Sequence, residues 1–145
     1  MRRRLENKIG NPIIIFLIDE QFAPQACGDR LLYNVFMNDL LKKKCVPCEG
    51  GVMPLNRAEA QDYLDEVPGW ALDEKAQKIS KEYKFKDFIG AINFVERVAD
   101  VAEMEEHHPD IHIHYNKVLL ELWTHAINGL SENDFIVAAK VDAMK

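Results

Sequence analysis

Pairs of strand-like segments joined by only a few residues constrain the fold of this chain more than any other sequence feature. Strands are predicted over residues 70–73 and 78–85, and again over residues 110–116 and 118–125, where apolar and polar side chains alternate. A parallel return between two strands needs a crossover of about a dozen residues or more, whereas a short connection allows an antiparallel return. The four segments therefore predict two antiparallel hairpins.

A long apolar-periodic segment between the hairpins predicts the principal helix, over residues 86–106. Its apolar residues recur at steps of three and four, which places them on one stripe of a helix. Pro109 follows this segment and prevents its continuation. The expected core-facing stripe consists of Phe88, Ile89, Ile92, Val95, Ala99 and Ala102.

Two shorter helices complete the pattern. The first is predicted over residues 57–67, after Asn56, a favourable N-cap residue. The last is predicted over residues 132–143, with Ser131 as N-cap and Asp134 at the third helical position. The order α-β-β-α-β-β-α indicates an α+β fold, a four-stranded antiparallel sheet with three helices packed on one face.

Charge and cysteine content limit the classes of partner and compartment. The 18 basic and 24 acidic residues give a net charge of −6, whereas binding to duplex nucleic acid needs clustered Lys and Arg. Three cysteines are too few for a disulfide framework, so we expect a reducing cytoplasm. The 145 residues are enough for one domain with a core.

Residues 1–36 are expected to lie outside the folded domain, which we place at residues 37–145. They carry 5 basic and 4 acidic groups, against 13 and 20 in the remainder. The apolar run at residues 12–18 is short of the roughly 20 residues of a membrane span, and Asp19 ends it before a typical secretory signal is complete. We interpret the segment as an extension or leader; the alternative is an additional strand or docking segment.

The titratable groups suited to chemistry near neutral pH are concentrated late in the chain. All five histidines fall between positions 107 and 125. His107 and His108 end the predicted long helix, and Glu103 lies one turn earlier, where it would orient the His107 ring. An antiparallel return would bring His125 back toward that helix end. Such a cluster supplies an acid and a base for proton transfer at pH 7.

Each of these residues also has a purely structural interpretation. The histidines at the helix end would be cations favoured by the C-terminal dipole, and His125 would be a hydrogen-bonded residue of the scaffold. Asp134 is first of all a partner in the predicted helix cap. His112 and His114 alternate with apolar residues of their strand, so we expect them to face solvent.

Metal binding is the more specific alternative to acid–base chemistry for this histidine cluster. The histidine spacing fits neither H-E-x-x-H nor a zinc finger, and Cys45-x-x-Cys48 lacks a second pair. We therefore expect no metal. The sequence also has no G-x-G-x-x-G, G-x-x-x-x-G-K-[ST] or G-x-S-x-G, so dinucleotide binding, P-loop chemistry and an esterase elbow have no support.

Several motifs with fixed spacing surround the histidines. They read Glu103-x-x-x-His107-His108-Pro109, Tyr115-Asn-Lys-Val118, Thr124-His125 and Gly129-Leu-Ser131-x-x-Asp134. Together they resemble the pattern of the pterin-4a-carbinolamine dehydratases, and Cys45-Val-Pro-Cys48-Glu-Gly-Gly and Pro68-Gly69-Trp70 resemble its bacterial members. The resemblance covers residues 38–143, and the family fold agrees with the order predicted above.

The resemblance implies dehydration of 4a-hydroxytetrahydropterin, a product of aromatic amino-acid hydroxylases, to quinonoid dihydropterin without metal or organic cofactor. It implies that His107 and His125 are the acid/base pair and that His108 binds substrate. Glu103 and Asp134 would be supporting residues in or beside the pocket. The implied partners are a pterin, a hydroxylase of the same pathway and further copies of the chain in a homodimer or homotetramer.

One position departs from the family pattern, and two other functions stay open. Ile111 stands where some relatives carry an aromatic residue, a departure that concerns the shape of the pterin pocket and not the chemistry. Animal relatives also serve as dimerisation cofactors for a transcription factor, so a non-catalytic interaction module is the first alternative. The second is a pterin-binding protein of another pathway, such as molybdopterin metabolism.

Overall fold

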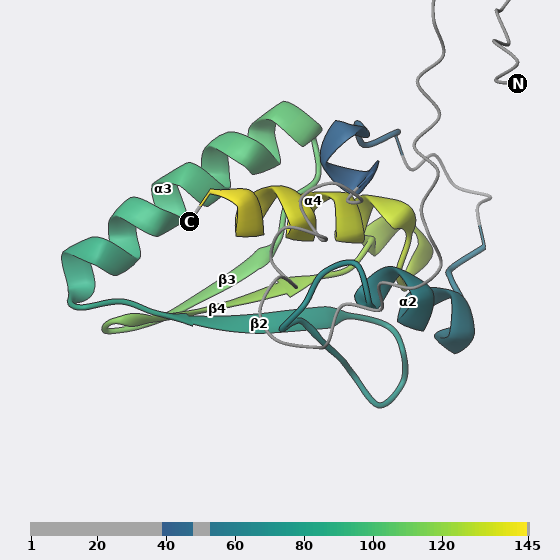
Figure 1. Cartoon of the computed structure of the whole chain (residues 1–145), viewed down its shortest axis with the longest axis horizontal. Coiled ribbons are helices and arrows are strands. Elements are labelled where there is room, and N and C mark those ends of the chain that lie inside the picture. The colour runs from purple at the N-terminus through teal and green to yellow at the C-terminus, as the bar shows by residue number, and fades with distance from the viewer. Residues whose placement is uncertain (1–38, 48–52, 145) are drawn as a thin grey trace, which may run out of the picture.

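The structure is a computed structural model that describes residues 39–47 and 53–144 (Figure 1). The expectations for residues 1–36 and for Cys48 lie outside the described residues. No helix within the described ranges is long and apolar enough to cross a membrane.

The described residues form the predicted order of helices and strands. Four antiparallel strands make one sheet in the order β1-β2-β4-β3, which confirms the α+β fold. The elements are η1 (Asp39–Lys42), α2 (Arg57–Leu64), β1 (Ala71–Leu72), β2 (Ile79–Lys84), α3 (Phe88–Glu105), β3 (Asp110–His114), β4 (Lys117–Leu122), η2 (His125–Ile127) and α4 (Glu132–Ala143).

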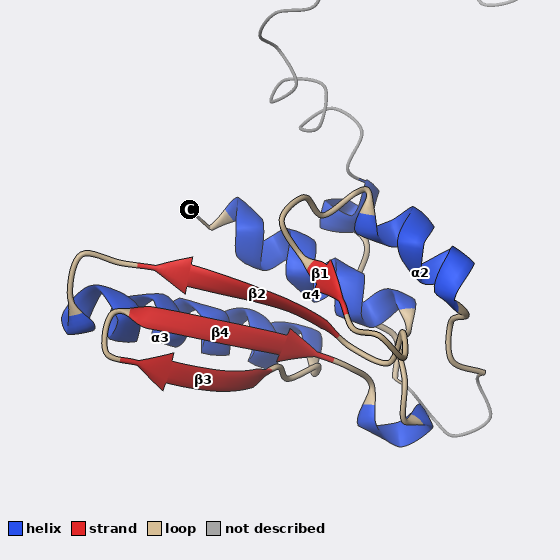
Figure 2. Cartoon of the chain, turned by 90° about the horizontal axis from the view of Figure 1, so that it is seen from below, coloured by secondary structure: helices blue, strands red, loops and turns tan. Residues whose placement is uncertain are grey.

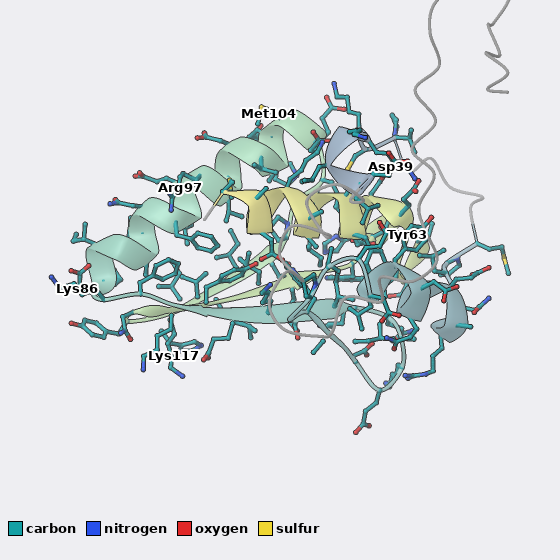
Figure 3. The ribbon with its side chains drawn as sticks, in the orientation of Figure 1. Asp39, Tyr63, Lys86, Arg97, Met104 and Lys117 are labelled. Atoms are coloured by element: carbon teal, nitrogen blue, oxygen red, sulfur yellow. The ribbon has the colours of Figure 1, made fainter. Side chains whose placement is uncertain are left out.

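Two helices, α3 and α4, cover one face of the sheet. Figure 1 shows α3 and α4 across this face, and Figure 2 shows the strands from the opposite side with these helices behind them. The α2 helix lies at the end of the sheet, beside β1 and α4. Lys117 points away from the helices on the other face (Figure 3).

The central strand follows the predicted alternation. Val118, Leu120 and Leu122 of β4 are fully buried, whereas Leu119 and the other intervening residues are partly exposed. The register places Val118 opposite Tyr83 and Leu122 opposite Ile79. The inward face of this strand pair is therefore continuous with the core beneath the helices.

The edge strand β3 is less buried than expected. The sequence pattern places Ile111, Ile113 and Tyr115 on one core-facing side, but only Ile111 packs against the core. Ile113 is 38% exposed and Tyr115 is 69% exposed. Tyr115 lies in the β3–β4 turn with φ of +55°, outside the strand, so the expectation for Tyr115 is wrong. Ile113 pairs with buried Val118 and so lies on the predicted side, but an edge strand has a neighbour on one side only, which leaves Ile113 exposed.

The α3 helix presents a different face to the core from the expected stripe. Ile89 is 64% exposed and Phe88 is 45% exposed. Of the six residues expected to face the core, only Ala102 is buried. The helix is apolar around more than half of its circumference, so two overlapping stripes satisfy the spacing of three and four. The buried face consists of Ala91, Phe94, Val98, Val101, Ala102 and Glu105.

Two predicted elements end earlier in the structure. The α2 helix stops at Leu64, because residues 65–69 turn toward β1 and the residue before Pro68 is disfavoured in a helical conformation. The β4 strand stops at Leu122, and Thr124 forms an isolated bridge with Gly129. This bridge closes a turn in which Asn128 adopts φ of +51°.

One polar cluster lies between the sheet and α4. Lys81 projects from β2 toward the helices, and its Nζ lies 2.8 Å from both carboxylate oxygens of Asp142. Asp142 also accepts hydrogen bonds from Tyr83 Oη (2.9 Å) and Trp70 Nε1 (3.0 Å). Burial, and then the Asp142 carboxylate, raise the pKa of Tyr83. The cluster fastens the C-terminal end of α4 to β2.

Candidate active site

The end of α3 places His107 at the junction of three elements. Glu106 adopts the left-handed conformation, with φ of +52°. Its N–H donates to Glu103 O, and the His107 N–H donates to Ala102 O at 3.1 Å, which is the hydrogen-bond pattern of a Schellman motif. His107 therefore leaves the helix axis and turns toward the N-terminal end of α4.

His107 forms a short hydrogen bond with a buried carboxylate. Its Nε2 lies 2.6 Å from Asp134 Oδ1, and the two side chains are 11% and 0% exposed. An ionised carboxylate can only accept, so Nε2 carries the hydrogen in this bond. Nδ1 is then the nitrogen of the neutral ring that can accept a proton.

Asp134 is held by donors from two segments. Its Oδ2 accepts hydrogen bonds from the Ser131 N–H at 2.8 Å and from Thr124 Oγ1 at 2.9 Å. Since Thr124 donates to the carboxylate, its Oγ1 accepts from Ser131 Oγ, 2.7 Å away. The cap at the start of α4 is confirmed, and the same carboxylate uses its other oxygen to orient His107.

His125 directly follows this network. It is the first residue of η2, one position after Thr124, and its ring contacts the ring of Trp123 at a tilt of 46°, with 3.9 Å between ring centroids. Trp123 Nε1 donates to Asp110 Oδ2 at 2.8 Å. Two bridges thus tie the segment around His125 to the segment around His107, one through Asp134 and one through Asp110.

Glu103 is placed differently from the sequence expectation. The spacing predicts that it orients His107, but its carboxylate lies 3.0 Å from His108 Nε2, and both of these side chains are largely exposed. A separation of four residues brings side chains together only inside a continuous helix, and α3 ends at Glu105. The expected contact of Glu103 with His107 is therefore wrong, and Asp134 takes that place.

The two other histidines lie on the face of the sheet opposite the helices. His112 and His114 are exposed, as predicted, and His112 Nε2 lies 3.2 Å from Glu121 Oε2. Across residues 39–47 and 53–144, no three side chains of His, Cys, Asp or Glu are grouped so that they could hold a metal ion.

The residues around Cys45, expected to be an irregular lead-in, run across the ends of α3 and α4. Glu105 accepts the Cys45 N–H at 2.9 Å and binds Lys140 at 2.6 Å, while the Asn133 amide both accepts from and donates to the backbone of Val46. Desolvation raises the pKa of Glu105, but the hydrogen bonds from Lys140 and Cys45 outweigh it and lower the value. Burial, with Glu105 nearby, raises the pKa of Cys45 to about 12.

Sequence reasoning missed the contacts of Thr124, Trp123 and Asp110. Their positions gave a usable indication, since two of them immediately precede His125 and Asp110 immediately follows the His-His-Pro motif. Ile111, where the sequence departs from the family pattern, packs its side chain against the core.

The fold and this site together define a class of protein, a small α+β protein with an imidazole–carboxylate pair where the end of α3 meets the start of α4. The model of the family described as pterin 4 alpha carbinolamine dehydratase matches residues 53–144. The chain belongs to this family of dehydratases, which are lyases.

Relatives agree with this membership. A protein of Halorhodospira halophila that carries the name pterin-4-alpha-carbinolamine dehydratase is 52% identical over 105 residues, which cover 72% of this chain and 96% of the relative. The mitochondrial pterin-4-alpha-carbinolamine dehydratase 2 of Arabidopsis thaliana is 46% identical over 111 residues, 74% of this chain and 59% of the relative. The crystal structure of a transcriptional coactivator/pterin dehydratase from Brucella melitensis is similar with a TM-score of 0.60 and 35% identity, over 63% of this chain and 97% of the other.

Proposed function

We propose that this chain dehydrates 4a-hydroxytetrahydropterin to quinonoid dihydropterin, with its histidines as general acid and base. The observation that carries the proposal is the short hydrogen bond of His107 to the buried Asp134 (2.6 Å). A buried carboxylate fixes both the orientation and the tautomer of an imidazole, which is the preparation that proton transfer requires. Family membership supplies the substrate class and the reaction.

The reaction needs one proton delivered and one removed. The C4a–O bond breaks as the hydroxyl group receives a proton and leaves as water. N5 loses its proton, and its electron pair forms the C4a=N5 double bond. Imidazoles suit both transfers at neutral pH, because their ordinary pKa lies near 6.5.

His107 and His125 are the proposed acid/base pair. In His107 the Nε2–H is engaged by Asp134, so Nδ1 is the nitrogen that would exchange a proton with substrate. His125 is exposed and is therefore accessible to a bound pterin. His108, with its partner Glu103, is the proposed substrate-binding group, and Asp134 supports the site through His107.

A direct assay tests this proposal. The 4a-carbinolamine is generated in situ by an aromatic amino-acid hydroxylase, and its decay is followed by absorbance with and without the purified chain. Faster decay in proportion to protein concentration is the expected result. A decay rate that stays at the uncatalysed value over a wide range of protein concentration contradicts it.

The reaction is expected to proceed without metal, because two imidazoles supply both proton transfers. Dialysis against EDTA should leave kcat unchanged within experimental error, and elemental analysis of the purified chain should find metal far below one equivalent. Readdition of Zn²⁺ to the dialysed protein serves as the control. Loss of activity on chelation with recovery on Zn²⁺ addition would contradict the acid/base mechanism.

We also propose that the chain self-associates into a homodimer or homotetramer. Apolar residues that are exposed or half-buried follow one side of α3 at steps of three and four. The β3 strand forms one edge of the sheet, which is a second surface available for pairing. The helix side concerned comprises Phe88, Ile92, Val95 and Ala99.

The substitution Ala99→Arg tests this surface. The Ala99 side chain is exposed, so the substitution should leave each copy folded. It places a charge in the proposed contact between two copies of α3. Light scattering coupled to size exclusion is expected to show a smaller species than for the unmodified chain. Asn93→Arg, which adds the same group at another exposed position of α3, is the control and should not change the mass; equal masses for all three proteins would contradict an α3 interface.

A non-catalytic coactivator role is the second candidate, favoured by the similarity to the Brucella melitensis protein, which is described as a transcriptional coactivator as well as a pterin dehydratase. The assay above separates the two, since a module that acts only by binding would not accelerate decay of the carbinolamine.

We propose that the chain works in the cytoplasm beside an aromatic amino-acid hydroxylase that produces its substrate.

A further inference from the structure

The His125 ring has one aromatic neighbour that the sequence did not assign to the site. The ring centroids of His125 and Trp123 are 3.9 Å apart at an interplanar angle of 46°. His125 is exposed and begins a 3-10 helix of three residues. Among the described residues, no hydrogen bond or ion pair holds its ring, so the contact with Trp123 is what restricts the imidazole.

Trp123 is itself anchored. Its Nε1–H donates to Asp110 Oδ2 at 2.8 Å, and hydrogen bonds to an ionised acceptor are stronger than neutral ones. The strand register supports this contact, because Asp110 pairs with Glu121, which is two residues before Trp123. Asp110 also follows the His107-His108-Pro109 motif, so the anchor joins the two histidine segments directly.

We infer that Trp123, held by Asp110, is a positioning residue that fixes the His125 imidazole for proton transfer. This inference rests on the proposed function of His125. An exposed histidine on a short turn would otherwise populate several rotamers, and proton transfer requires one of them. Contact with a fixed indole selects the rotamer without blocking the ring nitrogens by a hydrogen bond.

Substitutions test the Trp123–His125 ring contact and the Asp110 hydrogen bond separately. Trp123→Leu removes the aromatic contact surface and is expected to lower kcat by about 10-fold or more, because small misplacements of a catalytic group are costly. KM should stay within about twofold if His125 acts mainly in the transition state. Trp123→Phe keeps an aromatic surface and should restore most of kcat, while Asp110→Ala removes the anchor and should give an intermediate loss.

Leu119→Ala is the matched control. Leu119 lies on the same face of β4, is partly buried like Trp123 and belongs to no part of the proposed machinery. Its loss should lower the melting temperature without changing kcat. Melting curves of all variants show whether a loss of kcat follows from a loss of folded protein.

A readout independent of activity is the NMR spectrum of the histidine side chains. The indole ring current should shift the carbon-bound ring protons of His125 upfield in the unmodified chain, with His125→Ala providing the assignment. The shift should disappear in Trp123→Leu and persist in Leu119→Ala. Loss of both the shift and kcat in folded Trp123→Leu supports the inference.

Three results would overturn it. If the His125 protons show no upfield shift in the unmodified chain, the ring contact does not exist in solution. If Trp123→Leu raises KM and leaves kcat unchanged, Trp123 contacts the substrate instead of positioning His125. If His125→Ala keeps full activity, the proposed role of His125 fails, and an upfield His125 shift in the unmodified chain then shows that the ring contact exists without serving catalysis.

Discussion

His107→Ala is expected to lower kcat by roughly 100-fold or more, the usual contribution of a positioned general acid or base. The reason is the loss of the imidazole that Asp134 orients through a 2.6 Å hydrogen bond. His125→Ala should cause a loss of similar size. Steady-state kinetics of the carbinolamine assay measure both effects, and circular dichroism verifies that the variants are folded.

The other histidines supply graded controls for this series. His108→Ala should mainly raise KM, because binding that is equal in the ground and transition states affects KM alone. His112→Ala and His114→Ala should change neither constant, since no hydrogen bond or ion pair among the described residues joins either side chain to the proposed site, and His112 contacts Glu121 instead. An effect of His112→Ala equal to that of His107→Ala would show that His112 belongs to the site. Full activity of both His107→Ala and His125→Ala would refute the acid/base mechanism.

Asp142→Ala is expected to lower the free energy of unfolding by about 3 kcal/mol, in the range found when one partner of a largely buried ion pair is removed. The side chains of Lys81 and Asp142 are only 12% and 22% exposed. The substitution leaves the Lys81 ammonium without its carboxylate and removes the acceptor of Tyr83 and Trp70. Thermal unfolding should show a melting temperature lower by about 12 °C or more for a folded domain of roughly 100 residues.

An exposed ion pair is the matched control for this stability prediction. Glu82 and Lys117 lie 2.8 Å apart on adjacent strands, with 51% and 43% of their side chains exposed. Exposed pairs contribute about 0–1 kcal/mol, so Glu82→Ala should shift the melting temperature far less than Asp142→Ala. Equal shifts in the two variants would show that the Lys81–Asp142 pair contributes no more to stability than an exposed ion pair.

Features that depend on neighbours along the chain could be predicted from the residues alone. Alternation predicted the buried side of β4, because successive residues of a strand point to opposite faces. The Ser131–Asp134 spacing predicted the start of α4, and the same alternation predicted that His112 and His114 are exposed. The short connections between strands predicted the antiparallel sheet.

Packing between elements selected one of several locally equivalent arrangements. Two apolar stripes of α3 satisfy helical spacing, and packing against β2 and β4 selected the one that contains Phe94 and Val98. The left-handed residue Glu106 ended the helix, so His107 turned away from Glu103 and Glu103 became the partner of His108.

The site itself depends on contacts between distant segments. Asp134 reaches His107 across 27 positions of the chain, and Asp110 reaches Trp123 across 13. Periodicity describes only which side of one element a residue occupies, whereas these hydrogen bonds depend on how α3, α4 and β4 are placed relative to one another. The residue types of the site could therefore be named from the sequence, but their partners were set by the packing of the helices on the sheet.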